Sequence, residues 1–229
     1  EEFWEGYKGN GEPYGLINLE SSRRMGRTGD TQYPDPDVMG YNPCAEQSLA
    51  PYETCCLAEI FLPNIKSEKE LKKVARLLYR INKRMGIGVT GYLQATEEQR
   101  SWLETCYLYL REYDREYSKL TGLPQSIKLT TVKPSGTLSL LAGVTSGAHP
   151  AYSQYYIRRI RMSADSELVR VCRDHGYDIE YVRNFDGSED HSTVVVSFPC
   201  EFPKGTMLAG DMSAVDQLEV IKRLQAEWS

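Results

Sequence analysis

Residues 67–92 read SEKELKKVARLLYRINKRMGIGVTGY, and this stretch decides the fold class. Ser67 and Glu70 have the spacing of a capping box, which indicates the start of a helix. Apolar residues follow at helical intervals, at positions 71, 74, 78, 81 and 85. Gly86 is expected to end that helix. Residues 87–92 are short, apolar and rich in glycine, which predicts a buried strand against which other backbone packs closely.

Similar signals for helices and strands occur on both sides of residues 67–92. Thr96 and Gln99 form a second possible capping box, and Gly122 is expected to end the helix that follows. Further segments are predicted as strands at 14–19, 128–132 and 193–198, and as helices beginning at Asp165 and Ser213. Because strands alternate with helices, we expect an α/β fold with a largely parallel sheet, in one domain that covers residues 1–229.

Composition excludes several classes of protein. Of the 229 residues, 41% are hydrophobic and 26% are charged, as is usual in globular proteins. The net charge of −5 gives no support for nucleic-acid or membrane-surface binding. The sequence has no apolar run of the roughly 20 residues that a membrane span needs. Six cysteines are too few for a small secreted disulfide scaffold, so we expect a cytoplasmic protein with mostly reduced thiols.

A thiol, a carboxylate and a carboxamide lie within the five residues Asn42-Pro43-Cys44-Ala45-Glu46. Pro43 restricts the backbone, so a tight loop here would direct Cys44 and Glu46 to one side of a pocket. Glu46 is then a candidate to accept a proton from a substrate hydroxyl that Cys44 also contacts, with Asn42 bonding a second hydroxyl. Chance proximity of a cysteine and a glutamate is the alternative.

Cys55 and Cys56 follow Cys44 after 11 and 12 residues. Structural zinc sites usually combine two pairs of Cys or His ligands, whereas this segment has one adjacent pair, a lone cysteine and no nearby histidine. A redox role, in which a thiol gives up hydrogen and forms a disulfide, suits the pattern better. We expect no metal site.

The segment Pro134-Ser135-Gly136-Thr137, followed by Ser139, comes directly after a predicted strand. If a helix begins here, backbone N–H groups and hydroxyls would point at a bound anion. An ordinary helix cap is the alternative interpretation, and the residues alone favour it.

Three separate segments resemble ribonucleotide reductases, in the order that the family has them. They are the run from Asn42 to Glu46 with Cys55, the run NKRMGIGVTG at 82–91, and the run TTVKPSGTLS at 130–139. The resemblance covers nearly the whole chain. In detail it is similar to the monomeric, cobalamin-dependent ribonucleoside-triphosphate reductases.

The resemblance implies part of the ten-stranded α/β barrel of this family, with the Cys44 loop at its centre. It implies that Cys44 forms the thiyl radical that removes the ribose 3′ hydrogen and that Glu46 accepts the 3′-hydroxyl proton. Asn42 would bind substrate, and Cys55 would be half of the dithiol that reduces the 2′ position. The resemblance also makes the segment at Pro134, Ser135, Gly136, Thr137 and Ser139 a substrate-phosphate loop.

The cofactor and partners also follow from the resemblance alone: adenosylcobalamin, a ribonucleoside triphosphate, and a thioredoxin-type or dithiol reductant. His149 is an unsuitable cobalt ligand, since no Asp-x-His-x-x-Gly motif is present. The alternatives are a reductase that takes its radical from a metal-centre subunit, a glycyl-radical enzyme, and a non-catalytic nucleotide-binding module. No cysteine precedes Cys44, so we expect a fragment that is inactive without the rest of the reductase.

Overall fold

The structure is a computed structural model that describes residues 17–25, 31–81, 86–136 and 138–229. The chain forms two compact units. The first consists of Glu1–His149 together with Ser213–Ser229, and the second is Pro150–Met212. Each unit has its own core, so each is described by itself.

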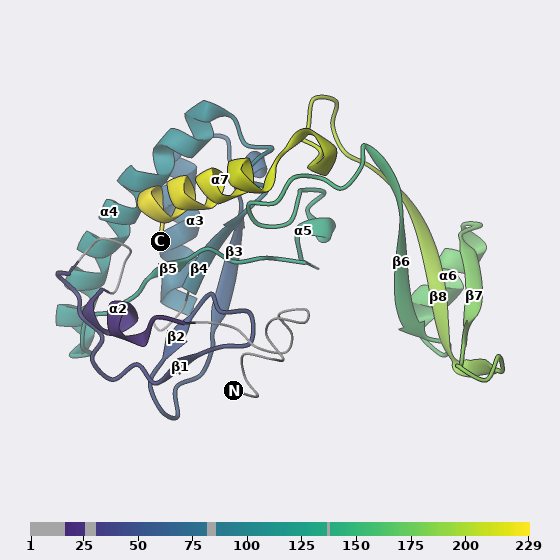
Figure 1. Ribbon diagram of the computed structural model, residues 1–229, viewed down its shortest axis with the longest axis horizontal. Coiled ribbons are helices and arrows are strands. Elements are labelled where there is room, and N and C mark those ends of the chain that lie inside the picture. Colours follow the sequence, from purple (N-terminus) through teal and green to yellow (C-terminus); the bar gives the residue numbers. More distant parts are fainter. Residues whose placement is uncertain (1–16, 26–30, 82–85, 137) are drawn as a thin grey trace, which may run out of the picture. The chain divides into compact units, whose positions relative to one another are not determined.

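A three-stranded parallel sheet forms the centre of the first unit (Figure 1). Its strands are β3 (Leu57–Phe61), β4 (Gly86–Thr90) and β5 (Thr130–Thr131), with β4 in the middle. One row of the register runs from Glu59 through Gly88 to Thr131. Strand β4 is buried along its whole length, which confirms the buried, glycine-rich strand expected at 87–92.

Three helices supply the core of this unit: α3 (Glu68–Ile81), α4 (Glu97–Thr121) and α7 (Ala214–Glu227). The capping box expected at Thr96 is present, a second one occurs at Ser213, where the last helix was expected to begin, and Gly122 ends α4 in the left-handed conformation. At the start of α3 the Ser67 hydroxyl accepts from the Glu70 N–H at 3.2 Å, but the Glu70 carboxylate bonds the Lys66 N–H. The end signals at Thr96, Gly122 and Ser213 are therefore confirmed, whereas the expectation that Gly86 ends the first helix is wrong: Gly86 begins β4, where its N–H donates to the Cys56 carbonyl at 3.0 Å.

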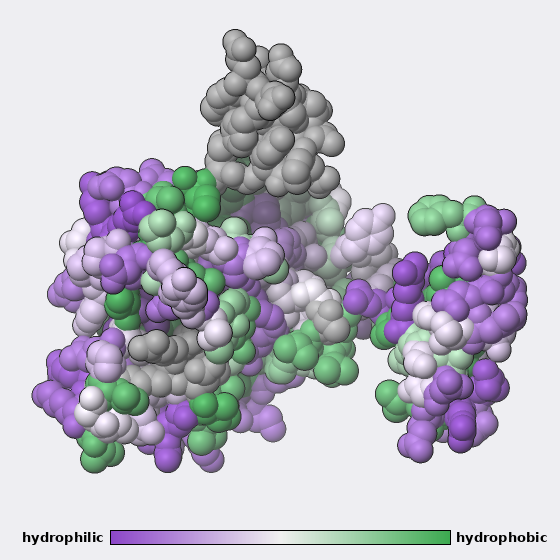
Figure 2. All heavy atoms as spheres, turned by 90° about the horizontal axis from the view of Figure 1, so that it is seen from below, coloured by the Kyte–Doolittle hydropathy of each residue, from purple (hydrophilic) through white to green (hydrophobic). Residues whose placement is uncertain are grey.

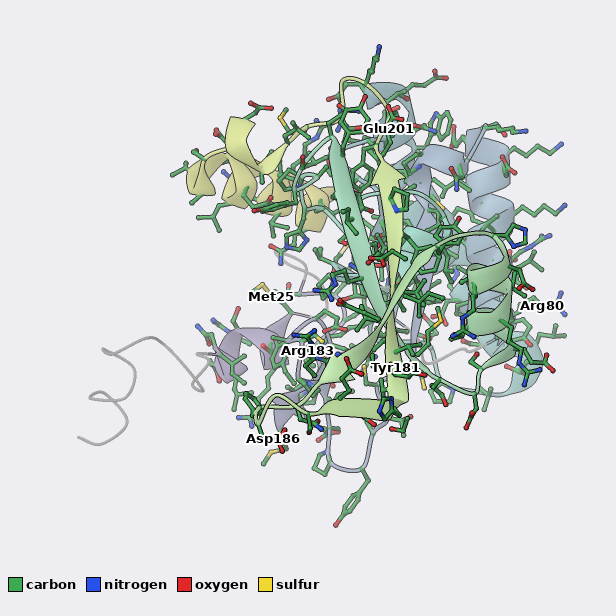
Figure 3. The ribbon with its side chains drawn as sticks, turned by 90° about the vertical axis from the view of Figure 1, so that its right-hand side faces the viewer. Met25, Arg80, Tyr181, Arg183, Asp186 and Glu201 are labelled. Atoms are coloured by element: carbon green, nitrogen blue, oxygen red, sulfur yellow. The ribbon has the colours of Figure 1, made fainter. Side chains whose placement is uncertain are left out.

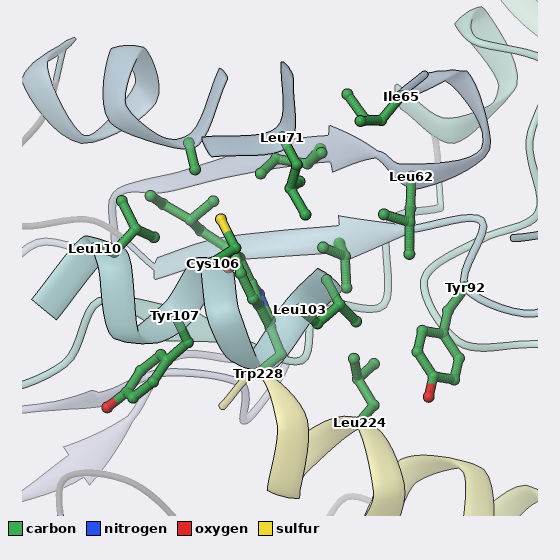
Figure 4. Packing of buried hydrophobic residues seen from close by; sticks show 14 of the residues in the cluster. Leu62, Ile65, Leu71, Tyr92, Leu103, Cys106, Tyr107, Leu110, Leu224 and Trp228 are labelled. Carbon is green, nitrogen blue, oxygen red and sulfur yellow. Dashed lines mark hydrogen bonds between the residues drawn. The ribbon is translucent and has the colours of Figure 1, made fainter. Parts of the chain in front are cut away.

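Trp228, directly after α7, is fully buried in this core beside α4 (Figure 4). Its indole N–H donates to the Ile87 carbonyl of β4 at 2.8 Å. The Thr130 hydroxyl of β5 donates to the Trp228 carbonyl. These bonds join the end of α7 to the two strands, and alternate residues of β3 and β4, among them Ile60, Ile87 and Val89, face the same apolar cluster.

Shorter elements complete the unit. A hairpin of β1 (Gly40–Tyr41) and β2 (Ser48–Leu49) precedes β3, a 3-10 turn η1 (Leu62–Asn64) follows β3, and α5 (Leu138–Leu141) follows β5. The strand expected at 14–19 is wrong where the structure describes it: α2 (Leu19–Arg24) begins at Leu19, because Asn18 accepts from the Ser21 N–H and caps a helix.

The second unit is an antiparallel sheet with the order β6-β8-β7. It contains β6 (Tyr155–Ser163), α6 (Glu167–Asp174), β7 (Asp178–Arg183), β8 (Glu189–Glu201) and η2 (Ala209–Asp211). Figure 3 shows Tyr181 and Arg183 on β7 and Asp186 in the turn that leads to β8. Helix α6 begins after Ser166 rather than at Asp165. The expectation of a largely parallel sheet is thus correct for the first unit and wrong for the second.

Hydrophilic and hydrophobic residues are interspersed over the face shown in Figure 2. Within the described residues, no helix has both the length and the apolar character that crossing a membrane would require.

Candidate functional site

The residues from Asn42 to Gln47 form the loop of the β1–β2 hairpin. The Asn42 N–H donates to the Gln47 carbonyl at 3.0 Å, and the Asn42 side-chain oxygen accepts from the Gln47 N–H at 2.9 Å. The Ala45 N–H donates to the Asn42 carbonyl, and Ala45 has a left-handed φ of 59°. Asn42 is buried and Cys44 is exposed. Asn42 therefore holds the tight loop that the sequence predicted, with the Cys44 thiol accessible.

Glu46 connects this loop to the central sheet through a hydrogen bond. The Thr131 hydroxyl of β5 donates to the Glu46 carbonyl. In the described part of the chain, the buried Oε2 atom of the Glu46 carboxylate has no hydrogen-bond partner. Buried polar atoms are rarely left without a partner, so this oxygen is a candidate acceptor for a hydrogen bond from a bound ligand.

The Cys55 thiol lies close enough to this loop to respond to its charges. Although Cys55 is exposed, partial desolvation of its thiol raises the pKa above the ordinary value, and the negative charge of Glu46 raises it further. A hydrogen bond with the Asn42 side chain lowers it, while the Cys56 and Cys44 thiols add smaller increases. The four predicted catalytic residues, Asn42, Cys44, Glu46 and Cys55, are thus brought together by the fold.

All six cysteines lie in the described residues, and none of them forms a disulfide there. Cys106 and Cys172 are buried, as expected for structural thiols, whereas Cys44 and Cys55 are exposed. Burial raises the pKa of Cys106 to about 12, so this thiol stays protonated. Within the described residues, no group of three or more His, Cys, Asp or Glu side chains is arranged to hold a metal ion.

A cavity of about 370 Å³ lies beside the loop, with Ala45 and Glu46 in its wall. That volume is within the usual range of small-molecule sites. Lys128 lines this cavity and also a second one of about 570 Å³, which Cys56 lines. The Lys128 ammonium pairs with the buried Asp35 carboxylate at 2.9 Å, so its charge is partly neutralised.

The predicted phosphate segment follows β5, but two of its hydroxyls point inward. Ser135 is buried and donates to the Glu59 carboxylate. Ser139 is also buried and donates to the Ser135 carbonyl at 2.9 Å. Pro134 and Gly136 are exposed, and Thr137 lies outside the described residues. Helix α5 has only four residues, so a phosphate role for this segment stays a prediction that rests on its backbone.

Sequence reasoning missed Glu59 and Lys133. The Glu59 side chain is 2% exposed and forms an ion pair with the Lys133 ammonium. One signal was available: a glutamate inside the apolar run LAEIFL at 57–62 has no place in a buried strand unless another group pairs with it.

His149 is exposed, and its Nδ1 atom lies 3.2 Å from the Ser146 carbonyl in its own turn.

No family model matches the chain. Several curated proteins, however, are similar in sequence to this chain. A probable adenosylcobalamin-dependent ribonucleoside-triphosphate reductase of Dictyostelium discoideum is 34% identical, over 96% of this chain and 32% of the relative. The adenosylcobalamin-dependent ribonucleoside-triphosphate reductase of Euglena gracilis is 35% identical, over 96% of this chain and 33% of the relative. The chain spans about a third of the length of these relatives.

A solved structure, the crystal structure of a B12-dependent (class II) ribonucleotide reductase, matches the fold. Its TM-score is 0.76 at 28% sequence identity, and the match covers all of this chain and 39% of that one. The α/β barrel segment expected from the sequence is therefore present. The identities with these relatives and the match to the solved structure show that the chain belongs to the ribonucleotide reductase family.

Proposed function

We propose that this chain is the part of a ribonucleoside-triphosphate reductase that holds the radical cysteine. The observation that carries the proposal is the accessible Cys44 thiol beside the Glu46 carboxylate, whose buried oxygen has no partner in the described residues. An unpaired buried acceptor next to an exposed thiol suits a site that takes hydrogen and a proton from neighbouring positions of one sugar.

Each step of the proposed reaction uses one of these side chains. The Cys44 thiyl removes the 3′ hydrogen of the ribose, and Glu46 accepts the 3′-hydroxyl proton. The 2′ hydroxyl leaves as water, and a dithiol that includes Cys55 supplies two electrons and two protons and becomes a disulfide. Cys44 then returns its hydrogen to C3′. The balance is a ribonucleotide and a dithiol giving a deoxyribonucleotide, a disulfide and water, for use in DNA synthesis.

Adenosylcobalamin, when bound, supplies the radical that Cys44 needs. The exposed position of Cys44 fits contact with such a group. The raised pKa of Cys55 keeps that residue as a thiol, which is the form that carries hydrogen. The substrate is proposed to be a ribonucleoside triphosphate, and the regenerating reductant a small dithiol or a thioredoxin-type protein.

The test uses the full-length reductase, labelled ribonucleoside triphosphate and dithiothreitol, with and without adenosylcobalamin. We expect deoxynucleotide only when adenosylcobalamin is present. In a single turnover without dithiothreitol, peptide mapping should find Cys55 in a disulfide and Cys200 still free. Turnover that needs a metal-containing subunit instead would overturn the cofactor assignment, and nucleotide binding without turnover would identify a binding module.

A further inference from the structure

Lys128 stands two residues before β5 and contacts two segments from much earlier in the chain. Its ammonium donates to the Asp35 carboxylate at 2.9 Å and to the Ser48 hydroxyl, across 93 and 80 positions of sequence. The side chains of Lys128 and Asp35 are 22% and 12% exposed. Charges that are covered to this extent need partners, so Lys128, Asp35 and Ser48 are held together in the folded chain.

Ser48 is the first residue after the loop that carries Cys44. In the β1–β2 hairpin it pairs with Tyr41, so these two residues close the loop. Each strand of the hairpin has only two residues, and a hairpin alone is marginally stable at best in water. The bonds between Asn42 and Gln47 set the shape of the loop, but the place of the hairpin on the sheet depends on contacts with other elements.

Two such contacts come from one short stretch of chain at β5. Lys128 donates to the Ser48 hydroxyl. Two positions before Ser48, the Glu46 carbonyl accepts from the Thr131 hydroxyl. Strand β5 is hydrogen-bonded to β4 in the central sheet, which gives this stretch a fixed place. One contact would leave the hairpin free to rotate about it, whereas two contacts fix its direction as well.

Asp35 attaches the chain that leads into the hairpin to the same ammonium. The Asp35 N–H donates to the Arg23 carbonyl at 2.9 Å, and the Asp35 carbonyl accepts from the Val38 N–H at 3.3 Å. The Arg23 guanidinium donates to the Val38 carbonyl at 2.8 Å. Lys128 therefore joins the segment before β1 and the start of β2 at one point.

We propose that Lys128 is a positioning residue for the radical thiol: by contacting Ser48 and Asp35 it fixes the base of the β1–β2 hairpin, and with it the position of Cys44. This inference rests on the proposed function. Hydrogen transfer to a thiyl radical needs the reacting atoms in contact, and a displacement of about 1 Å can reduce the rate about 100-fold. Lys128 acts in this step through Ser48.

The test compares two variants of the full-length reductase. Ser48→Ala removes one contact and keeps the ion pair, and should lower kcat about tenfold, the scale of one hydrogen bond to a charged group. The double variant Asp35→Asn with Lys128→Met removes both charges together, so that neither is left unpaired, and should lower kcat about 100-fold. KM for the ribonucleoside triphosphate should change less than about threefold in both.

A second readout follows the hairpin itself. Hydrogen–deuterium exchange of residues 40–49 should become about tenfold faster in both variants, because the hairpin loses an attachment. Exchange of the buried strand β4 should stay the same, which separates a released hairpin from a general loss of stability. Lys222→Met is the matched control: it removes an exposed ion pair with Glu219 on α7 and should leave kcat, KM and exchange unchanged.

Unchanged kcat and unchanged exchange in Ser48→Ala would overturn the inference. Because Lys128 lines two cavities, a raised KM in the double variant beside an unaffected Ser48→Ala would overturn it too, by showing direct contact with substrate. If the double variant does not fold, Ser48→Ala decides alone. If the wild-type reductase makes no deoxynucleotide, the proposed function fails, and exchange of residues 40–49 still decides whether Lys128 holds the hairpin.

Discussion

The two faces of the β3-β4-β5 sheet differ in chemistry although they share the same strands. On one face, Ile60, Ile87 and Val89 pack under the helices and Trp228. The other face carries Gly86, Gly88 and Thr90 of β4, Thr131 of β5, and the buried Glu59 side chain between Leu57 and Phe61 of β3. Apolar contact on the first face stabilises the fold. The second face gives up that contact to hold two loops by hydrogen bonds, so changes on the two faces should have different consequences.

The largest effect is expected at the loop held by the polar face. Cys44→Ser in the full-length reductase should reduce turnover by a factor of at least about 10⁴, the scale seen when a reacting side chain is removed. Its thermal unfolding should be unchanged, because the Cys44 side chain is exposed. Cys200→Ser is the matched control and should retain turnover. Deoxynucleotide formation by Cys44→Ser above the level of the enzyme-free reaction would contradict the assignment.

Substitutions on the apolar face should lower the free energy of unfolding without changing KM. Trp228→Ala removes a fully buried indole and its bond to the Ile87 carbonyl, and should lower the free energy of unfolding by about 3–5 kcal/mol. KM measured below the unfolding transition should stay the same. Leu218→Ala, an exposed position on α7, should change stability by less than about 0.5 kcal/mol. Denaturant unfolding of the three proteins makes the comparison, and an equal loss in both variants would refute it.

Gly88→Ala tests the polar face from within the sheet. The added methyl group would meet Lys133 at 2.7 Å, so we expect a loss of about 1–3 kcal/mol in stability. Gly40→Ala on β1, where a Cβ meets nothing within 4 Å, is the control and should be close to neutral. Denaturant unfolding of both variants makes the comparison, and equal stabilities would show that Lys133 gives way to the added methyl group.

The smallest effect concerns the reactivity of Cys55. Because the Glu46 charge raises the pKa of the Cys55 thiol, Glu46→Gln should lower that pKa and increase the thiolate fraction at any pH below it. Alkylation of Cys55 by iodoacetamide at pH 8, followed by peptide mapping, should become roughly two- to threefold faster. Glu53→Gln serves as the control and should leave the rate unchanged. Slower alkylation in Glu46→Gln would reverse the sign of the proposed coupling.

The sequence predicted the apolar face better than the polar one. Helices α3, α4 and α7 have periodic apolar residues and end signals that depend on nearby positions only. The pairing of Glu59 with Lys133 spans 74 residues, so nothing local marked it. Strands β6 and β7 were missed because arginines and glutamates occupy much of their exposed surface, which weakens the apolar alternation. Asn42, Cys44 and Glu46 could be named as candidate site residues because they lie within five positions of a run that resembles a family signature, and their roles stay predictions.

The interrupted course of the first unit has a consequence for how the protein is made. Pro150–Met212 is inserted between His149 and Ser213, and Trp228 bonds to residues 98 and 141 positions earlier in the chain. A ribosome releases the chain from its N-terminus, so β3, β4 and β5, together with α3 and α4, emerge well before α7 and Trp228. During that interval the part of the apolar core that α7 and Trp228 complete is open to other chains, and a chaperone that binds apolar segments would find its target there.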